Sequence, residues 1–294
     1  MRDVYLITGA TGFIGSNLVR RLVSQNKKVA ILTRAKKLNW RLESLKGSIG
    51  VYECDLLDKK LPKVIQTINP DYIFHLASTG ENQTDAIKNT YDTNCLGTVN
   101  LIEALKLVKF KLFINCGSFE ENYQSSHFAI SKSTATAYCT REAQAGNLPI
   151  ITIRRPTAYG YFDCERSPIC ALFLSRITKN KIGRVEGTYS RDIIFIDDLI
   201  EAYIQSTVQN IKKGSQLDIY GEEVIDSILL KRIIQKWEKR KGLDDGWDKN
   251  FAFDSIIRHN PNKKQALKWE SSTKLSQGLV SFYEWLAENK KYYL

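Results

Sequence analysis

Few residues of the kinds that build a metal centre or a disulfide framework occur in this 294-residue sequence. It has three histidines and six cysteines, with no C-x-x-C pair and no histidine at a zinc-ligand spacing. No apolar run approaches the roughly 18 to 20 residues that a membrane helix needs. A strand pattern begins directly after the first residues, where a signal peptide would otherwise stand. We therefore expect no metal site, free thiols, and a soluble protein of the reducing cytoplasm.

Acidic residues are also in short supply, because 32 of them face 43 basic ones, for a net charge of +11. Apolar residues make up 43%, charged residues 26%, and only 6 residues are proline, which excludes a disordered or fibrous chain. Residues 27–46 contain one acidic residue, Glu43, and seven basic ones: Lys27, Lys28, Arg34, Lys36, Lys37, Arg41 and Lys46. Such a cluster suggests nucleic acid or a membrane surface, unless a local ligand accounts for it.

Short β-rich runs alternate with longer amphipathic stretches over the first 155 residues. The expected strands are 4–8, 29–33, 50–54, 72–77, 112–116 and 150–154, and the expected helices between them include 13–25, 85–107 and 129–145. Near-continuous apolar strands separated by helices predict a parallel sheet covered on both faces, the doubly wound α/β (Rossmann) fold. Its ligands bind beyond the carboxyl ends of the strands.

The alternation loosens after about residue 160. We expect helices near 169–178, 226–241 and 274–288, and short strands near 192–196 and 217–220. The length allows one large or two modest domains. We therefore predict a dinucleotide-binding domain, residues 1–160, and a smaller C-terminal substrate-binding subdomain, residues 161–294, interleaved with it.

A glycine pattern joins the first strand to the first helix. Glycines allow a tight turn and a close approach of the backbone to a pyrophosphate, which the helix N-terminus then holds. The alternative is a plain Gly-rich turn, but the strand before, the helix after and the distance to the second strand favour a dinucleotide site. The residues predicted to bind it are Gly9, Thr11, Gly12, Phe13, Ile14 and Gly15.

The second strand ends at Thr33 and Arg34, where an NAD-preferring site would place Asp or Glu. An acid there would repel a 2′-phosphate, whereas a guanidinium can clamp it with paired hydrogen bonds. This favours NADP(H) over NAD(H). Lys36 and Lys37 either assist or form a solvated surface. The cofactor would then explain the basic cluster with neither nucleic acid nor membrane as a partner.

Further motifs follow in order: Cys54-Asp55-Leu56, His75-Leu76-Ala77, Asn94, Arg155-Pro156, Arg191-Asp192 and the Phe-Ile-Asp-Asp-Leu run at 195–199. With the glycines, they resemble the extended short-chain dehydrogenase/reductases, and more narrowly their nucleotide-sugar epimerase, dehydratase and 4-ketoreductase branch, over essentially the whole chain. The resemblance implies cofactor contacts from Asp55, Leu56, Leu76, Ala77, Ser78, Cys116, Arg155 and Pro156. It implies contacts to a nucleotide-diphosphate sugar from Thr79, Glu120, Thr157 and Arg191. His75, inside an apolar run, is expected to be a packed strand residue.

The family's catalytic pattern is Tyr-x-x-x-Lys on one helix, with a Ser or Thr after the fifth strand. Here Ser118 and Lys132 match, but Phe128 stands at the tyrosine position and cannot donate a proton. Three interpretations stay open: an engineered Tyr→Phe change, recruitment of Tyr123, His127 or Ser118 as the proton donor, or an inactive NADP(H)-binding member.

The segment between Ser118 and Phe128 is short for an epimerase or dehydratase of this family. The 4,6-dehydratases place an acid pair after the strand-five Thr, and here Phe119 replaces the first acid while Glu120 supplies the second. These features and Arg34 resemble small 4-ketoreductases of the CDP-abequose synthase type. The alternatives are a nucleotide-sugar epimerase or dehydratase, or a non-catalytic member. The resemblance also implies a homodimer through the helices near 85–107 and 128–145.

Overall fold

The computed structural model describes residues 3–80, 86–178, 190–221, 223–226, 258–259 and 267–294. The chain forms two units. The first consists of residues 1–155, 200–219 and 266–268, and the second of residues 156–199, 220–265 and 269–294. The first crossing therefore follows Arg155, near the boundary of 160 expected from the sequence, and the chain later returns to the first unit twice.

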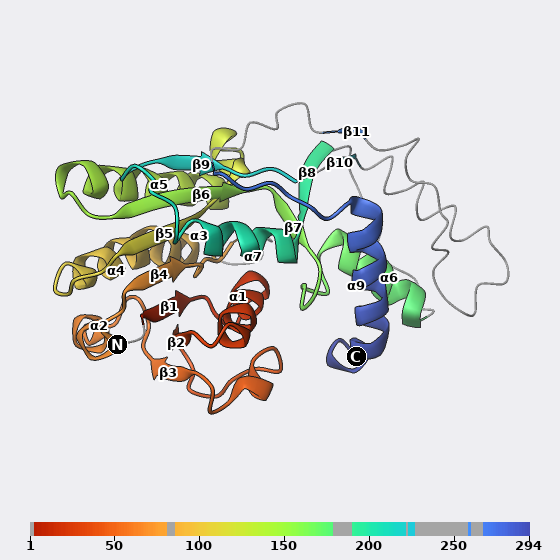
Figure 1. The fold of residues 1–294 in the computed structure, drawn as a ribbon, viewed down its shortest axis with the longest axis horizontal. Helices are drawn as coiled ribbons and strands as arrows, with labels where there is room; N and C mark the ends of the chain where they lie inside the picture. Colours follow the sequence, from red (N-terminus) through yellow and green to blue (C-terminus); the bar gives the residue numbers. More distant parts are fainter. Residues whose placement is uncertain (1–2, 81–85, 179–189, 222, 227–257, 260–266) are drawn as a thin grey trace, which may run out of the picture. The chain divides into compact units, whose positions relative to one another are not determined.

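A seven-stranded sheet, all of whose strand pairs are parallel, forms the first unit (Figure 1). Its order is β3-β2-β1-β4-β5-β6-β9. The strands are β1 (Val4–Thr8), β2 (Lys28–Thr33), β3 (Gly50–Glu53), β4 (Tyr72–His75), β5 (Leu112–Ser118), β6 (Ile150–Arg155) and β9 (Gln216–Asp218). This confirms the predicted doubly wound parallel sheet.

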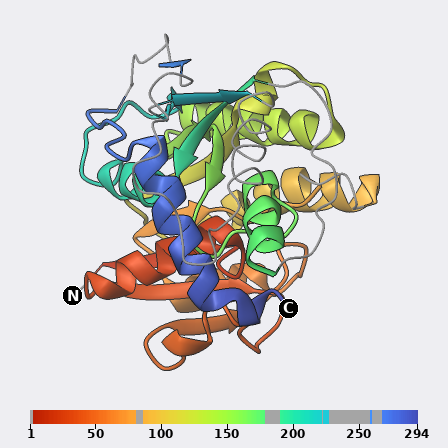
Figure 2. The ribbon, with the colours of Figure 1, turned by 90° about the vertical axis from the view of Figure 1, so that its right-hand side faces the viewer.

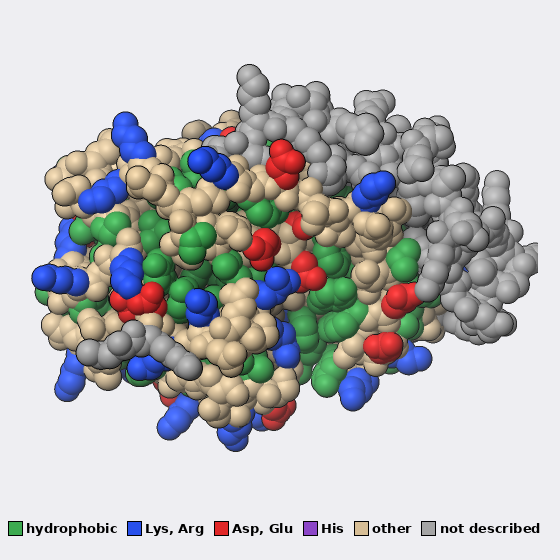
Figure 3. All heavy atoms as spheres, viewed as in Figure 1, with side chains coloured by type: hydrophobic (Ala, Val, Ile, Leu, Met, Phe, Trp, Pro, Cys, Tyr) green, Lys and Arg blue, Asp and Glu red, His purple; other side chains and the backbone are tan. Residues whose placement is uncertain are grey.

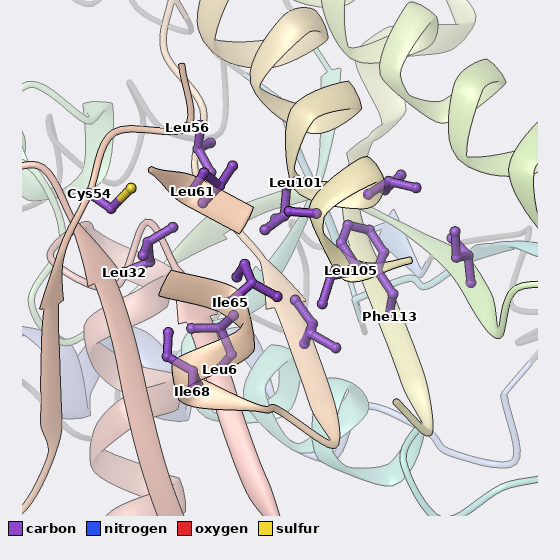
Figure 4. Packing of buried hydrophobic residues seen from close by; sticks show 14 of the residues in the cluster. Leu6, Leu32, Cys54, Leu56, Leu61, Ile65, Ile68, Leu101, Leu105 and Phe113 are labelled. Carbon is purple, nitrogen blue, oxygen red and sulfur yellow. The ribbon is translucent and has the colours of Figure 1, made fainter. Parts of the chain in front are cut away.

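Helices cover both faces of this sheet because the strands are apolar on both sides. On one face lie α2 (Leu61–Ile68), α4 (Gly97–Leu105) and α5 (His127–Ala145). Figure 4 shows how α2 and α4 leucines and isoleucines meet strand residues such as Leu6 and Phe113. On the other face lie α1 (Phe13–Ser24) and α7 (Ile196–Gln205), whose Tyr203 ring meets Phe74 edge-on at 6.3 Å between centroids.

The helix expected over 85–107 is not one regular helix. It consists of α3 (Ile87–Tyr91), a π-helical turn η2 (Asp92–Leu96) and α4. The π turn adds one residue to the helical repeat and turns the Asn94 side chain into the interior, where it is buried. The helical prediction is confirmed over 87–105, but hydrophobic periodicity does not register such an inserted residue and the π turn was not predicted.

The second unit contains a four-stranded mixed sheet of order β11-β10-β8-β7. Its strands are β7 (Thr157–Tyr159), β8 (Ser190–Phe195), β10 (Glu223–Asp226) and β11 (Arg258–His259). Its helix α9 (Leu275–Asn289), blue in Figure 2, packs on α6 (Pro168–Thr178) through Phe173, whose ring lies 5.6 Å from that of Phe282. The helix expected near 226–241 lies outside the described residues.

The described residues also bear on disulfides, membrane-spanning helices and metal ligands. All six cysteines are free. Within the described ranges, no helix has the length and apolar character to cross a membrane. No group of three or more His, Cys, Asp and Glu side chains in that part of the chain could hold a metal ion.

Candidate active site

The glycine turn lies at the carboxyl end of β1 and has no room for side chains. Gly9 has φ +67°, and a Cβ there would lie 2.6 Å from the backbone of Leu76 and Ala77. A Cβ on Gly15 would lie 2.3 Å from the carbonyl oxygen of Gly9. Only glycine fits either position without moving the backbone. The turn thus packs directly against the segment that follows β4.

The first turn of α1 follows this glycine turn and carries no acidic residue and no side-chain cap. Gly12 is its N-cap, and Phe13 and Ile14 begin the helix. Uncapped N–H groups and the positive end of the helix dipole favour an anion at this place. Asn39, in the segment after β2, donates from Nδ2 to the carbonyl of Thr11 at 2.9 Å and so holds the two segments together.

The basic cluster at 27–46 is divided between the two ends of β2. Arg34, Lys36 and Lys37 are exposed and follow the carboxyl end of the strand. Lys27 and Lys28 lie at its amino end, about 20 Å away at 3.3 Å per residue. The expectation that the whole cluster surrounds the cofactor was wrong, because a one-dimensional count merges residues that a strand separates.

The segment after β3 presents the second predicted contact. Asp55 is half-buried, and its carboxylate accepts the N–H of Leu57 at 2.8 Å, which forms a tight turn. Leu56 is buried, and its carbonyl accepts a hydrogen bond from Asn100 in α4 at 3.0 Å. Both residues therefore lie in a fixed turn at the carboxyl edge of the sheet.

His75, the last residue of β4, is buried in a directed hydrogen-bond chain. Thr98 donates its hydroxyl hydrogen to the carbonyl of Asn94 at 2.6 Å, so its oxygen accepts from Nε2 of His75 at 2.9 Å. Nδ1 then accepts from the hydroxyl of Thr8 at 2.7 Å. Burial, with a further contribution from the charge of Lys132, lowers the pKa of His75 to about 3. The ring is a neutral packing element, as expected.

The residues after β4 are positioned by backbone hydrogen bonds. The N–H of Ala77 donates to the Thr8 hydroxyl at 3.2 Å, and Leu76 donates to the Thr8 carbonyl at 3.3 Å. Ser78 is exposed at the edge. Thr79 exchanges two 2.9 Å hydrogen bonds between its backbone and the Asn94 amide.

Asn94 also connects this segment to the helix that carries the catalytic pattern. Its Nδ2 donates to Oγ of Ser131 in α5 at 2.9 Å. Ser131 in turn donates to the carbonyl of Phe128 at 2.8 Å. The π turn therefore ties the β4 segment to the first turns of α5, next to Lys132.

Ser118 ends β5 and caps the short helix η3 (Phe119–Asn122). Its Oγ accepts the N–H of Glu120 at 3.2 Å, and its own N–H donates to Oε1 of Glu121 at 2.7 Å. This capping box fixes the serine from both sides and leaves its hydroxyl hydrogen to donate. Glu121 itself is buried.

Side-chain hydrogen bonds of Arg154, in β6, also hold the η3 turn. Nε and Nη2 of Arg154 bind both carboxylate oxygens of Asp218 in β9, at 2.6 and 2.9 Å. Nη1 of Arg154 donates to Oδ1 of Asn122 at 2.8 Å. One bidentate pair thus orients the guanidinium that holds η3. Nothing in the sequence motifs singles out Glu121, Arg154 or Asp218.

Cys116 and Tyr203 form a buried pair behind Ser118. The Cys116 sulfur lies 2.8 Å from the Tyr203 hydroxyl. Burial and the neighbouring thiol raise the pKa of Tyr203 well above its ordinary value, so the Tyr203 hydroxyl stays protonated. Cys116 therefore lies behind the edge as part of the core.

Lys132 lies one helical turn after Phe128 on α5, as the pattern requires. Both side chains are buried, with 4% of Lys132 and 3% of Phe128 exposed. No acidic side chain among the described residues forms an ion pair with Lys132. Burying a lysine side chain without a counter-ion is costly, and such an arrangement points to a functional site.

The other proposed proton donors are exposed. Tyr123 is 77% exposed beyond η3. His127, the first residue of α5, is exposed, and its Nδ1 lies 3.3 Å from the Tyr91 hydroxyl. The structure thus brings Ser118, but neither of these, into a buried, fixed geometry.

The remaining predicted residues divide between the units. Arg155 ends β6 in the first unit, whereas Pro156, Thr157 and Arg191 belong to the second. Thr157 begins β7, which pairs with β8. Arg191 lies in β8 opposite Ile225. The arrangement of these residues around a substrate stays a prediction.

A dinucleotide fits the first unit on two observations. The glycine turn leads into an α1 N-terminus with no side-chain cap and no acidic residue in its first turn, and the Lys132 side chain is buried with no protein counter-ion among the described residues. A model described as "NAD dependent epimerase/dehydratase family" matches residues 5–220. The chain belongs to the NAD dependent epimerase/dehydratase family. The resemblance read from the motifs is therefore confirmed, and the first unit carries the family's glycine turn.

Individual members of this family match over much of their length. UDP-glucuronate 4-epimerase of Thermodesulfobacterium geofontis is 25% identical over 97% of this chain and 96% of its own. CDP-abequose synthase of Salmonella muenchen is 25% identical over 78% of each chain. The Bordetella bronchiseptica enzyme WbmF, solved with NAD⁺ and UDP, superimposes with a TM-score of 0.81 at 20% identity, over 99% of this chain and 94% of its own. The last likeness shows the fold alone.

Proposed function

We propose that this protein reduces the 4-keto group of a nucleotide-activated sugar at the expense of NADPH. The observation that carries the proposal is Lys132: its side chain is only 4% exposed, it forms no ion pair with a carboxylate of the described residues, and it lies on the helix of the catalytic pattern. The CDP-abequose synthase relative and the short Ser118–Phe128 segment favour a reductase within the family.

The residues at the carboxyl edge would divide the work of binding. Gly9, Gly12 and Gly15 with the N-terminus of α1 would hold the pyrophosphate, and Arg34 the 2′-phosphate. Lys132 would hold the nicotinamide ribose. When bound, NADPH supplies the hydride that reduces the carbonyl carbon.

Ser118 would supply the proton that the missing tyrosine hydroxyl cannot. Its oxygen already accepts the Glu120 N–H, and its own hydrogen is left to point toward the reacting oxygen. The Lys132 charge would stabilise the alkoxide that forms there. Solvent would then return the proton to Ser118.

The preference for NADP(H) over NAD(H) is inferred from Arg34. It is exposed at the carboxyl end of β2, with Lys36 and Lys37 beside it in the sequence. The WbmF structure holds NAD⁺, so the cofactor is the first thing to measure. A homodimer through the α3–α4 and α5 helices stays a prediction.

The test is turnover with a panel of 4-keto nucleotide sugars, followed by NADPH oxidation, in the wild type and in Phe128→Tyr. Restoring the tyrosine adds a general acid, and we expect turnover to rise by about 10²-fold. Lys132→Met is the inactive control. If neither form turns over any substrate while NADPH still binds, the protein is a non-catalytic member and the proposal is wrong.

Relatives that are 4-epimerases favour a second candidate, a nucleotide-sugar epimerase in which bound NAD is recycled. The two candidates differ in their use of cofactor. Protein purified with tightly retained NAD, together with product formation without net NADPH consumption, would establish the epimerase and contradict the reductase.

A further inference from the structure

The amino edge of the first unit's sheet, opposite the catalytic edge, is lined with lysines. Because all seven strands are parallel, the segments that lead into them meet at one edge. Exposed lysines lie in the segments before β2, β3, β5 and β9, namely Lys27, Lys28, Lys46, Lys106, Lys109, Lys111, Lys212 and Lys213. Lys268 joins them, since its backbone exchanges hydrogen bonds with the Gln209 side chain at 3.0 and 3.3 Å. We call this set the lysine edge.

Four acidic groups pair with only two of the nine lysines of the lysine edge. Asp3 and Asp71, the acids in the described segments that enter the strands, both bind Lys111. Lys106 binds Glu103 and Glu142 of the neighbouring helices. The described part of the chain offers no ion pair to Lys28, Lys109 or Lys212. The lysine edge therefore carries a net positive charge, at the edge of the sheet opposite the proposed cofactor site.

Apolar side chains are exposed among these lysines. Leu107 is 55% exposed between Lys106 and Lys109, and Val208 is 76% exposed in the segment before β9. At the starts of β1 and β4, the Tyr5 and Tyr72 rings stack 4.9 Å apart, with Lys27 and Lys111 each 5.7 Å from a ring centroid. Figure 3 shows Lys and Arg side chains along the left margin, toward which the amino ends of the strands lie in Figure 1.

The chemistry of this edge favours a lipid surface over a nucleic acid. The described segments that enter the strands contain lysine but no arginine, the residue that reads bases and clamps phosphates in pairs. Their most exposed apolar residues are aliphatic, whereas single-stranded nucleic acids stack on aromatic rings. Clustered lysines with exposed aliphatic side chains suit the diffuse negative charge and apolar boundary of an anionic bilayer.

We propose that the lysine edge docks the protein reversibly on an anionic membrane surface, with the catalytic edge facing away from it. This inference goes beyond the proposed reaction and does not depend on it. It replaces the expectation that the cofactor alone accounts for the basic excess. Docking by charge of this kind is salt-dependent, because the Debye length falls to about 3 Å at 1 M salt.

The test is flotation of the full-length protein with vesicles of phosphatidylcholine containing phosphatidylserine, against vesicles of phosphatidylcholine alone. We expect binding to the anionic vesicles in about 0.1 M salt and its loss in about 1 M salt. The triple change Lys28→Glu, Lys109→Glu, Lys212→Glu should weaken binding by at least about 100-fold, since each lysine contributes about fivefold.

A matched control carries the same change of charge elsewhere: Lys63→Glu, Lys274→Glu, Lys290→Glu, all at exposed positions. It should keep vesicle binding, and both triples should keep NADPH binding as evidence of folding. Equal loss in the two triples would mean that net charge alone drives binding and would overturn the proposal. So would absence of binding to the anionic vesicles, or edge-dependent binding to duplex DNA in their place.

Discussion

The two edges of the seven-stranded sheet are made by the same strands, yet they differ in how their charges are held. At the carboxyl edge, Lys132 is buried without a counter-ion among the described residues, and Ser118 is fixed by two hydrogen bonds. At the amino edge, the lysines are exposed and several have no ion pair within the part of the chain that the structure describes. The first arrangement costs stability and the second does not. A charge kept at such cost marks chemistry, whereas charges on an exposed edge mark a surface.

The largest expected effect comes from Lys132 at the carboxyl edge, with Lys109 at the amino edge as its control. Lys132→Met should lower kcat/KM by about 10² to 10⁴-fold, because the charge beside the reacting oxygen is lost. The same change should not lower the Tm of the ligand-free protein, since methionine keeps a buried apolar stem and no ion pair among the described residues is lost. Lys109→Met should change neither quantity. Steady-state kinetics and thermal unfolding check both variants. A lower Tm for Lys132→Met would mean that Lys132 forms a stabilising interaction, and it would contradict an unpaired lysine.

The second comparison uses the two ends of β2. Arg34→Asp should reduce the preference for NADPH over NADH by about 100-fold, because an acid repels the 2′-phosphate and accepts from ribose hydroxyls. Lys28→Asp, at the amino end of the strand, should leave the preference unchanged. Titration with both cofactors measures it. If the two variants behave alike, Arg34 is solvated surface and the NADP(H) assignment is wrong.

The third effect is the pH dependence of stability at the carboxyl end of β4. His75 has a pKa of about 3 in the folded chain and near 6.5 in the unfolded one, so between these values the unfolded chain binds more protons. The His75 contribution to stability is therefore fully present above pH 6.5 and falls as the pH drops, by about 2 kcal/mol at pH 5, whereas Asp192, whose pKa burial raises to about 7, contributes in the opposite direction. Urea unfolding of wild type and His75→Asn at pH 7 and 5 isolates the histidine. The wild type should lose more stability than His75→Asn between these pH values, and the exposed His127→Gln should behave as the wild type.

The smallest effect concerns the turn that fixes Ser118. Glu121→Ala should lower kcat by about tenfold with little change in KM, because the Ser118 N–H loses its acceptor and the serine loses its orientation. Glu121→Gln keeps an acceptor oxygen and should retain most of the activity. Glu103→Ala, on α4 at the base of the lysine edge, should be silent in the same assay. If Glu121→Ala raises KM but leaves kcat unchanged, Glu121 does not position Ser118.

The sequence predicted the parallel sheet, the glycine turn and the family, because these depend on strong local signals. Strand predictions agree with the structure within two residues at most ends, since continuous apolar runs end where the chain turns. Helix α2 was not predicted, although its Leu61, Ile65 and Ile68 have regular helical spacing. It is short, and its polar residues resemble a loop.

The parts of the site that could not be predicted depend on contacts between distant residues. Arg154 reaches Asp218 across 64 positions, and Asn94 reaches Ser131 across 37. No spacing rule connects such pairs. The prediction that the basic cluster surrounds the cofactor was wrong for a related reason. Lys28 and Arg34 are close in the sequence, but β2 separates them and places them at opposite edges of the sheet.

The position of β9 in the chain has a consequence for synthesis. The strand that closes the sheet beside β6 comes from residues 216–218, and it brings Asp218 to Arg154. A nascent chain that has emerged only to residue 160 has the six strands from β1 to β6 but leaves the edge of β6 unpaired, and open strand edges invite association. The Tyr203 that covers Cys116 is also still absent. The first unit therefore cannot be completed vectorially on the ribosome until much of the second has been made.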